Sequence, residues 1–295
     1  MNKISNITIL GGGNMGSQIA FQTAFKGFNV TIYDINADLY SQVIENLELL
    51  KNIYLREAHA TEDEMDATFN NISYSFNLPE AVQDADITIE AIPENMEMKQ
   101  KLYTELGRVA PAKTIFTTNS STMLPSDLMG FTGRPHKFLA LHFSNLLFHC
   151  NIAEIMKSSE TDADSYNTVI EFAEAIGMIP ILVKQEQRGY ILNSLLMPFM
   201  AAATELYLKG VSDIETIDKT WRIATGSPVG PFEIYDIVGI NTVYNIAANG
   251  DLKAKLFAQY LKENFIKQGK LGYLSGEGFY KHPKEKGINI TKTKK

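Results

Sequence analysis

Cysteine and tryptophan are nearly absent from this sequence, whose 295 residues include one of each. A single cysteine, Cys150, cannot form a disulfide within the chain, which is typical of proteins from a reducing compartment. Basic residues are also in the minority, 27 against 34 acidic ones, giving a formal net charge of −7. This balance argues against nucleic acid or an anionic membrane surface as the main partner.

A charged and apolar leader is lacking too, because the first β-branched run follows the initial methionine almost directly. We therefore expect a cytoplasmic location. The most apolar stretch, residues 190–208, is too often interrupted to predict a membrane span, and we expect a buried helix there. Its interruptions are Asn193, Ser194, Pro198, Thr204 and Glu205.

What the sequence does have is a glycine pattern between two strand-like runs. Residues 7–10 are β-branched and apolar, and residues 29–33 resume as a strand that ends before Asp34. Between them, Gly11-Gly-Gly-Asn14-Met15-Gly16 opens a helical stretch. G-x-G-x-x-G alone is a weak signal, but here it stands in the βαβ context that a dinucleotide requires.

Each position of this motif predicts a role in binding NAD. Gly11 permits a tight turn, Gly13 lets the backbone approach a pyrophosphate, and Gly16 lets the helix pack closely. The phosphates would lie at the helix N-terminus, beside Asn14 and Met15. Asp34 would accept hydrogen bonds from the adenosine ribose and repel a 2′-phosphate, so NAD is expected rather than NADP.

The rest of the first 186 residues alternates strands with helices. Strand-like runs recur at 72–75, 87–90, 114–117, 136–142, 153–156 and 179–183. Residues 36–70 form a helical excursion, whose second helix is expected to begin at Thr61 with Glu64 completing a capping box. This pattern predicts an α/β fold with a Rossmann-like doubly wound sheet.

Strand signals vanish from residue 189 onward. The remainder predicts helices broken at Gly210, at residues 226–231 and near Gly269. We therefore expect two domains: a dinucleotide-binding domain over residues 1–186 and an all-helical domain over residues 187–295.

Polar loops follow three of the expected strands, at residues 90–95, 117–122 and 142–145. In a doubly wound sheet the ligand lies beyond the carboxyl ends of the strands, so these loops should face the reacting ring of the cofactor. His142 could act as a general base, with Glu154, twelve residues later, fixing its tautomer. Position alone leaves open a core or capping histidine, which is the commoner outcome.

Metal binding is not expected. His136, His142, His149 and Cys150 lie close together in the sequence, but their spacing matches no familiar zinc pattern. Cys150 is not expected to be a nucleophile either.

Seven motifs, in order and spread over nearly the whole chain, give a resemblance to the 3-hydroxyacyl-CoA dehydrogenases, particularly the short bacterial 3-hydroxybutyryl-CoA type. They are Gly11-Gly-Gly-Asn-Met-Gly-Ser-Gln-Ile-Ala, Glu90-Ala-Ile-Pro-Glu-Asn, Thr118-Asn-Ser-Ser, Leu141-His-Phe-Ser-Asn, Gly189-Tyr-Ile-Leu-Asn, Gly226-Ser-Pro-Val-Gly-Pro-Phe-Glu and Gly276-Glu-Gly-Phe-Tyr. The resemblance implies NAD-dependent interconversion of an L-3-hydroxyacyl-CoA, such as 3-hydroxybutyryl-CoA, and its 3-keto form.

The resemblance also implies site residues. His142 matches the catalytic base and Glu154 its partner, while Ser121 contacts the substrate oxygen and cofactor, and Asn193 completes the site from the helical domain. Positions near the nicotinamide and its ribose are Glu94, Lys99, Asn119 and Asn145. The helical excursion resembles the arm that touches coenzyme A, and the second domain resembles a homodimerisation domain.

Four departures from the family pattern bear on the substrate. Leu146 replaces a proline, Arg188-Gly-Tyr190 replaces Pro-Gly-Phe, Ser194 replaces an arginine, and Leu274 replaces a lysine. These changes leave open a dehydrogenase of a free 3-hydroxy acid, such as a sugar acid or carnitine. A non-catalytic NAD-binding protein is a further alternative. A lysine-based 6-phosphogluconate type is disfavoured, since the stretch after Gly189 has no lysine before Lys209.

Overall fold

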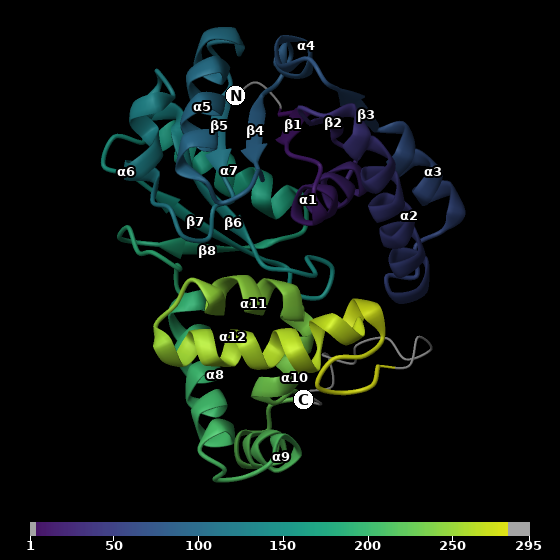
Figure 1. The fold of residues 1–295 in the computed structure, drawn as a ribbon. Helices are drawn as coiled ribbons and strands as arrows, with labels where there is room; N and C mark the ends of the chain where they lie inside the picture. Colours follow the sequence, from purple (N-terminus) through teal and green to yellow (C-terminus); the bar gives the residue numbers. More distant parts are fainter. Residues whose placement is uncertain (1–3, 283–295) are drawn as a thin grey trace. The chain divides into compact units, whose positions relative to one another are not determined.

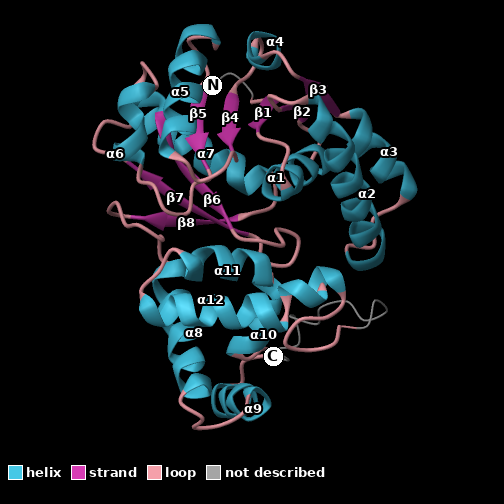
Figure 2. Ribbon diagram, viewed as in Figure 1, coloured by secondary structure: helices cyan, strands magenta, loops and turns pink. Residues whose placement is uncertain are grey.

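The computed structural model describes residues 4–282. The chain divides into two compact units, Met1–Ile191 and Leu192–Lys295. All named strands within the described residues belong to the first unit, as the magenta arrows of Figure 2 show. The predicted Rossmann-like sheet with a separate helical part is therefore confirmed.

The first unit is built on one eight-stranded sheet with the order β3-β2-β1-β4-β5-β6-β7-β8. Neighbouring strands are parallel except β6 and β7, which are antiparallel. The strands are β1 (Asn6–Leu10), β2 (Asn29–Tyr33), β3 (Ile72–Ser75), β4 (Ile87–Glu90), β5 (Ile115–Thr118), β6 (Phe138–Phe143), β7 (Ile152–Lys157) and β8 (Ile179–Val183). The strand expected at 136–142 begins two residues later, because Pro135–Lys137 form a 3₁₀ turn.

Helices cover both faces of this sheet (Figure 1). One buried cluster joins the sheet to α1 (Asn14–Phe25), α2 (Tyr40–Glu57), α3 (Glu62–Asn70) and α7 (Ala163–Ala175). A second joins its other face to α4 (Leu78–Val82), α5 (Met96–Val109) and α6 (Pro125–Leu128). Both faces of the sheet are buried, which explains why the central strands are nearly continuous apolar runs.

The helical excursion starts with the short turn η1 (Ala37–Leu39) and consists mainly of α2 and α3. At the start of α3, the Thr61 hydroxyl accepts the backbone N–H of Glu64, and Glu64 Oε2 accepts the backbone N–H of Thr61 at 2.8 Å. This is the capping box predicted from the sequence.

The second unit consists of α8 (Leu192–Leu208), α9 (Ile214–Thr225), α10 (Pro231–Val238), α11 (Ile240–Ala248) and α12 (Leu252–Asn264), followed by short 3₁₀ turns at Ile266–Gln268 and Tyr273–Ser275. The chain breaks where the sequence predicted, with left-handed glycines at Gly210, Gly226 and Gly269. Gly278 is required for another reason: a Cβ there would lie 2.0 Å from Asp236 Oδ1, which accepts the N–H of Phe279.

The two units divide after Ile191, close to the expected boundary, because the Tyr190 hydroxyl and the Ile191 N–H bond to the first unit. One expectation about residues 190–208 needs correction. In α8 only Met200, Ala203 and Thr204 are buried, whereas apolarity alone predicted a buried helix. Several of its large apolar side chains are exposed, including Leu195 at 70%. No helix in residues 4–282 is long and apolar enough to cross a membrane.

Candidate active site

The glycine turn after β1 has the geometry that a dinucleotide needs. Gly11 has φ +107°, and a Cβ there would lie 2.8 Å from the carbonyl oxygen of Ala91. A Cβ on Gly16 would lie 1.8 Å from the carbonyl oxygen of Gly11, so α1 packs directly against the turn. Gly13, in contrast, is exposed, and a Cβ there would meet nothing within 4 Å. This open face is where a pyrophosphate could approach the backbone.

The N-terminus of α1 also fits an anion. Gly13 is its N-cap and offers no side chain, and the first turn holds no acidic residue. The first N–H groups of a helix lack intrahelical partners, so they can bind phosphate oxygens here. Asn14 and Met15 form the start of this turn, the first exposed and the second half-buried.

Asp34 lies directly after β2, beside the same turn. Its Oδ2 accepts the backbone N–H of Gly12 at 2.9 Å, and its Oδ1 accepts the N–H of Ile35 at 2.8 Å. The side chain is half-buried, and each oxygen has a lone pair beyond the one that accepts these N–H groups. The residues of this region therefore fit the adenosine end of NAD.

His142 and Glu154 form a buried pair at the carboxyl end of β6. They are directly opposite each other in the antiparallel register of β6 and β7, which puts both side chains on one face of the sheet. His142 Nδ1 lies 3.1 Å from Glu154 Oε2, and the two residues are 4% and 1% exposed. The second oxygen, Oε1, accepts the backbone N–H of Ile191 at 2.9 Å. A buried carboxylate with two donors orients the imidazole.

Ser121 lies at the other nitrogen of the same ring. Its Oγ is 3.1 Å from His142 Nε2. If Nδ1 donates to Glu154, Nε2 carries a lone pair and accepts from the Ser121 hydroxyl. The first unit thus brings three of the four predicted catalytic residues into one chain of contacts: Glu154, His142 and Ser121. The fourth, Asn193, lies in the first turn of α8 in the second unit.

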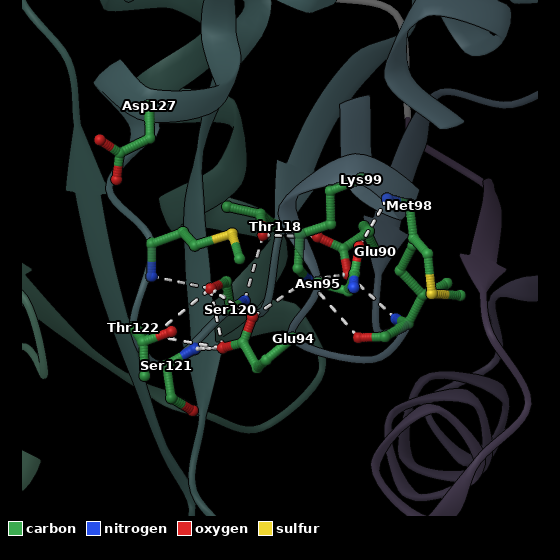
Figure 3. A network of polar contacts seen from close by, with 12 residues as sticks. Glu90, Glu94, Asn95, Met98, Lys99, Thr118, Ser120, Ser121, Thr122 and Asp127 are labelled. Atoms are coloured by element: carbon green, nitrogen blue, oxygen red, sulfur yellow. Dashed lines mark hydrogen bonds and ion pairs between the residues drawn. The ribbon is translucent and has the colours of Figure 1, made fainter. Parts of the chain in front are cut away.

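The loop that carries Ser121 is held by Glu94 (Figure 3). Glu94 Oε1 accepts the backbone N–H groups of Ser121 at 2.7 Å and Thr122 at 3.2 Å. Both carboxylate oxygens lie 2.8 Å from the hydroxyl of Ser120. Glu94 therefore fixes the backbone from which the Ser121 hydroxyl reaches His142.

Next to Glu94 lies a buried ionic network, of which Figure 3 shows Glu90, Lys99 and Thr118. Lys99 Nζ is 2.5 Å from Glu90 Oε1 and 3.4 Å from Glu94 Oε2. Glu90 Oε2 accepts the Thr118 hydroxyl at 2.7 Å and the Tyr103 hydroxyl at 3.2 Å. Burial, with the charge of Glu90, raises the pKa of Tyr103 well above its usual value, so this phenol stays protonated and donates. Lys99, 1% exposed, holds two carboxylates.

The remaining predicted cofactor residues lie in neighbouring loops. Asn119 follows β5, and its Oδ1 accepts the backbone N–H of Phe143 at 2.9 Å, which ties two strand ends together. Asn145 follows β6 and is half-buried. Both belong to the same edge of the sheet as Ser121 and His142.

The connection from β6 to β7, residues 144–151, explains one departure from the family pattern. Leu146 has φ +59°, and its backbone N–H donates to Gln18 Oε1 at 2.9 Å. Proline cannot adopt a positive φ and has no N–H, so the loop of this chain differs in conformation from one with proline.

The same loop is docked on α2 of the helical excursion. The Phe148 ring lies 5.1 Å from that of Tyr54, and His149 Nε2 lies 2.6 Å from Glu57 Oε2. Burial raises the pKa of the neighbouring Cys150 thiol, which therefore is a poor nucleophile. Within residues 4–282, no group of three or more His, Cys, Asp or Glu side chains could hold a metal ion.

Two residues of the site, Ser120 and Tyr190, are not among those predicted from the sequence. For Ser120 the signal is visible, because paired serines follow a strand end. The Tyr190 ring stacks on His142 with centroids 4.4 Å apart. No sequence pattern predicts a stack between two residues that lie this far apart along the chain.

Comparison with known proteins gives two family-model matches. Residues 6–186 match the "3-hydroxyacyl-CoA dehydrogenase, NAD binding domain" and residues 189–282 match the "3-hydroxyacyl-CoA dehydrogenase, C-terminal domain". A probable 3-hydroxybutyryl-CoA dehydrogenase of Bacillus subtilis is 32% identical, over 94% of this chain and 97% of its own length. The mitochondrial hydroxyacyl-coenzyme A dehydrogenase of Homo sapiens is 30% identical, over 95% and 91%.

Among solved structures, a diketoreductase described for "dual catalysis of dicarbonyl compounds" is 55% identical and has a TM-score of 0.89, covering 96% of this chain and 100% of its own. Together these matches confirm the resemblance drawn from the motifs, and NAD as the cofactor.

Proposed function

Because the chain belongs to the 3-hydroxyacyl-CoA dehydrogenase family of NAD-dependent oxidoreductases, we propose that it interconverts a short-chain L-3-hydroxyacyl-CoA, such as 3-hydroxybutyryl-CoA, and the 3-ketoacyl-CoA. The observation that carries this proposal is the chain of contacts from Glu154 through His142 to Ser121 at the strand ends. An oriented imidazole is the side chain that most often acts as general base, and it can take the proton of a secondary alcohol.

Each residue has a defined part in the proposed reaction. Bound at the glycine turn, NAD would supply the acceptor for the hydride of substrate C3. His142 Nε2 takes the proton of the C3 hydroxyl, and Glu154 stabilises the imidazolium that results. Ser121, held by Glu94, orients the substrate oxygen toward Nε2. Asn193 is the fourth residue that we propose for the catalytic set.

A second candidate is the reduction of a free dicarbonyl compound or oxidation of a free 3-hydroxy acid. Two observations favour it: the 55% identical diketoreductase, and the Leu146 loop conformation that a family proline would forbid. The chemistry at His142 is the same in both candidates, and only the part of the substrate beyond the carbonyl differs.

Loss of NADH absorbance distinguishes the candidates. Purified protein would be assayed with acetoacetyl-CoA, free acetoacetate, dehydrocarnitine and a simple diketone, each with NADH and with NADPH. We expect rapid oxidation of NADH with acetoacetyl-CoA. Turnover with the free compounds alone would establish the second candidate, and NADH binding without any turnover would indicate a non-catalytic nucleotide-binding protein.

The variant His142→Gln tests the base. We expect its kcat to fall by roughly two to four powers of ten, the usual scale for general-base removal, while the Kd for NADH stays unchanged. Full activity in this variant would remove His142 from the mechanism.

We further propose a cytoplasmic homodimer formed through the helical domain. Exposed apolar side chains on and around α8 and α9 support the dimer: Leu195, Leu206, Leu208, Val211 and Ile223. Light scattering should give twice the monomer mass, and Leu195→Glu should shift the species toward monomer. A wild-type monomer would refute the dimer.

A further inference from the structure

The last residues of the first unit, 187–191, lie across the His142–Glu154 pair. The backbone N–H of Ile191 donates to Glu154 Oε1 at 2.9 Å, and the Tyr190 hydroxyl donates to the carbonyl oxygen of Ser120 at 2.9 Å. This segment therefore contacts Glu154 directly and also the loop that carries Ser121.

Arg188 adds a third attachment. Its guanidinium donates to the carbonyl oxygen of Thr122 at 2.8 Å and pairs with Asp127 at 2.9 Å. The segment is thus fixed on both sides of Tyr190.

Tyr190 itself covers one face of the imidazole. The two rings are nearly parallel, with an interplanar angle of 12° and centroids 4.4 Å apart. Tyr190 is only 1% exposed, so the phenol also excludes water from that face. Burial raises the pKa of Tyr190, so its hydroxyl stays protonated as the donor to Ser120.

The backbone around Tyr190 is strained. Gly189 has φ +79° and Tyr190 has φ +53°, a conformation that non-glycine residues adopt rarely. Such strain persists where surrounding contacts fix it, and it clusters at functional sites. Here the contacts are the stack on His142 and the bond to Ser120.

We propose that Tyr190 is a positioning residue for the catalytic base. Its ring fixes the imidazole in the plane in which Nδ1 meets Glu154 and Nε2 meets Ser121, and its π face stabilises the imidazolium after proton uptake. The inference rests on the proposed role of His142 in catalysis, and it adds a residue that touches neither substrate nor cofactor in that role.

The charged surroundings set the sign of the expected pH effect. Glu154 faces the His142 ring at Nδ1, and the neutral Ser121 lies at Nε2. On the side of Tyr190, the negative charges of Glu94 and Glu90 act on the phenol. Substitution of Tyr190 leaves the three carboxylates in place. Loss of the π face disfavours the imidazolium, so the base stays neutral to lower pH.

The test compares Tyr190→Leu with Tyr190→Phe. For Tyr190→Leu we expect kcat to fall by roughly 10- to 100-fold, as for a misplaced catalytic group, with the KM for NADH within about twofold of wild type. In the oxidative direction, the midpoint of the acid limb of kcat/KM should fall by about half a pH unit. Tyr190→Phe keeps the ring, and should keep both the midpoint and most of kcat.

Tyr166→Leu is the matched control. Tyr166 lies on α7, where its ring contacts the Lys157 ammonium at 5.0 Å instead of His142. Removal of this tyrosine should leave the midpoint unchanged. A Tyr190→Leu variant with unaltered kcat and midpoint would overturn the proposal. So would a loss of kcat that comes with a lower Tm and no midpoint shift, since that outcome indicates a purely structural role.

Proton NMR separates this inference from the proposed function. The sequence has five histidines, so the His142 ring proton signal can be assigned by its loss in His142→Gln. In wild type the stacked phenol should displace this signal upfield, and Tyr190→Leu should abolish the displacement and lower the titration midpoint. This result holds even if no substrate is turned over. An undisplaced wild-type signal would refute the stack itself.

Discussion

His142 and Glu154 are direct partners in the antiparallel register of β6 and β7, with Nδ1 3.1 Å from Oε2. The strand pairing, not the loop between the strands, therefore sets their distance. A loop of another conformation, such as the one that the positive φ of Leu146 gives this chain, can therefore join the two strands without separating the pair.

Glu154→Gln should be nearly as damaging as removal of the base. The two oxygens of the Glu154 carboxylate meet different groups, His142 Nδ1 and the Ile191 N–H, and an amide has only one acceptor oxygen. We expect kcat to fall by roughly two to four powers of ten with NADH affinity retained. Steady-state kinetics on this variant, beside the exposed Glu160→Gln as control, would check it. If Glu154→Gln and Glu160→Gln had the same kcat, the Glu154 carboxylate would not be what orients His142.

Gly16 and Gly13 should respond differently to alanine. Gly16→Ala places a Cβ 1.8 Å from the Gly11 carbonyl oxygen, and should cost about 1–3 kcal/mol or more of unfolding free energy. Gly13→Ala meets nothing within 4 Å, so it should cost at most about 1 kcal/mol through the poorer N-cap, while the NADH Kd rises by roughly tenfold because the backbone contact is lost. Urea unfolding and NADH fluorescence titration measure the two effects. Unchanged NADH affinity in Gly13→Ala would place the pyrophosphate elsewhere.

Asp34→Asn should weaken the discrimination between NADH and NADPH. The amide keeps an acceptor for the Gly12 N–H but no longer repels a 2′-phosphate. We expect the ratio of kcat/KM for NADPH over NADH to rise by roughly tenfold, which is 1.4 kcal/mol. The ratio is measured with one carbonyl substrate at fixed ionic strength. If it does not change, Asp34 does not face the adenosine ribose.

Asp86 should make stability depend on pH in the acid range. Burial opposes its ionisation, but bonds from Lys113 Nζ at 2.6 Å and from the N–H groups of Ser5 and Asn6 outweigh it and lower the pKa. A carboxyl with a lowered folded pKa stabilises the fold above its unfolded value of 3.8, and this contribution is lost as pH falls through the folded value.

Accordingly, Asp86→Asn should reduce the unfolding free energy by about 1–3 kcal/mol at pH 7, and the deficit should shrink below about pH 4. Urea unfolding at both pH values checks this, with the exposed Asp84→Asn as control. A deficit that is the same at both pH values would show that the charge of Asp86 is not what stabilises the strand ends.

Much of the candidate site follows from local patterns. The glycine motif lies in one βαβ unit, so its turn, helix start and Asp34 are all encoded within 24 residues, Gly11 to Asp34. The capping box at Thr61 and the breaks at Gly210, Gly226 and Gly269 are local as well. Short-range φ preferences and hydrogen bonds decide these features, which is why they could be predicted.

Other features have no local signal. The Lys99 ammonium is buried between Glu90 and Glu94, a pairing that depends on how α5 packs over β4 and that the sequence did not predict. Tyr190 reaches His142 only because two left-handed residues turn the chain back over β6. The exposed side of α8 likewise could not be distinguished from a buried one by apolarity alone.

The sequence by itself determined the βαβ dinucleotide unit, the alternation of strands and helices and the change to a helical second part, because each rests on periodicity or a fixed motif. It predicted the His–Glu pair through the family resemblance. Only the tertiary structure decided the reversed direction of β7, which brings Glu154 opposite His142. It also decided the placement of Tyr190 on the imidazole and the burial of Lys99, since contacts between distant segments depend on packing that no local pattern encodes.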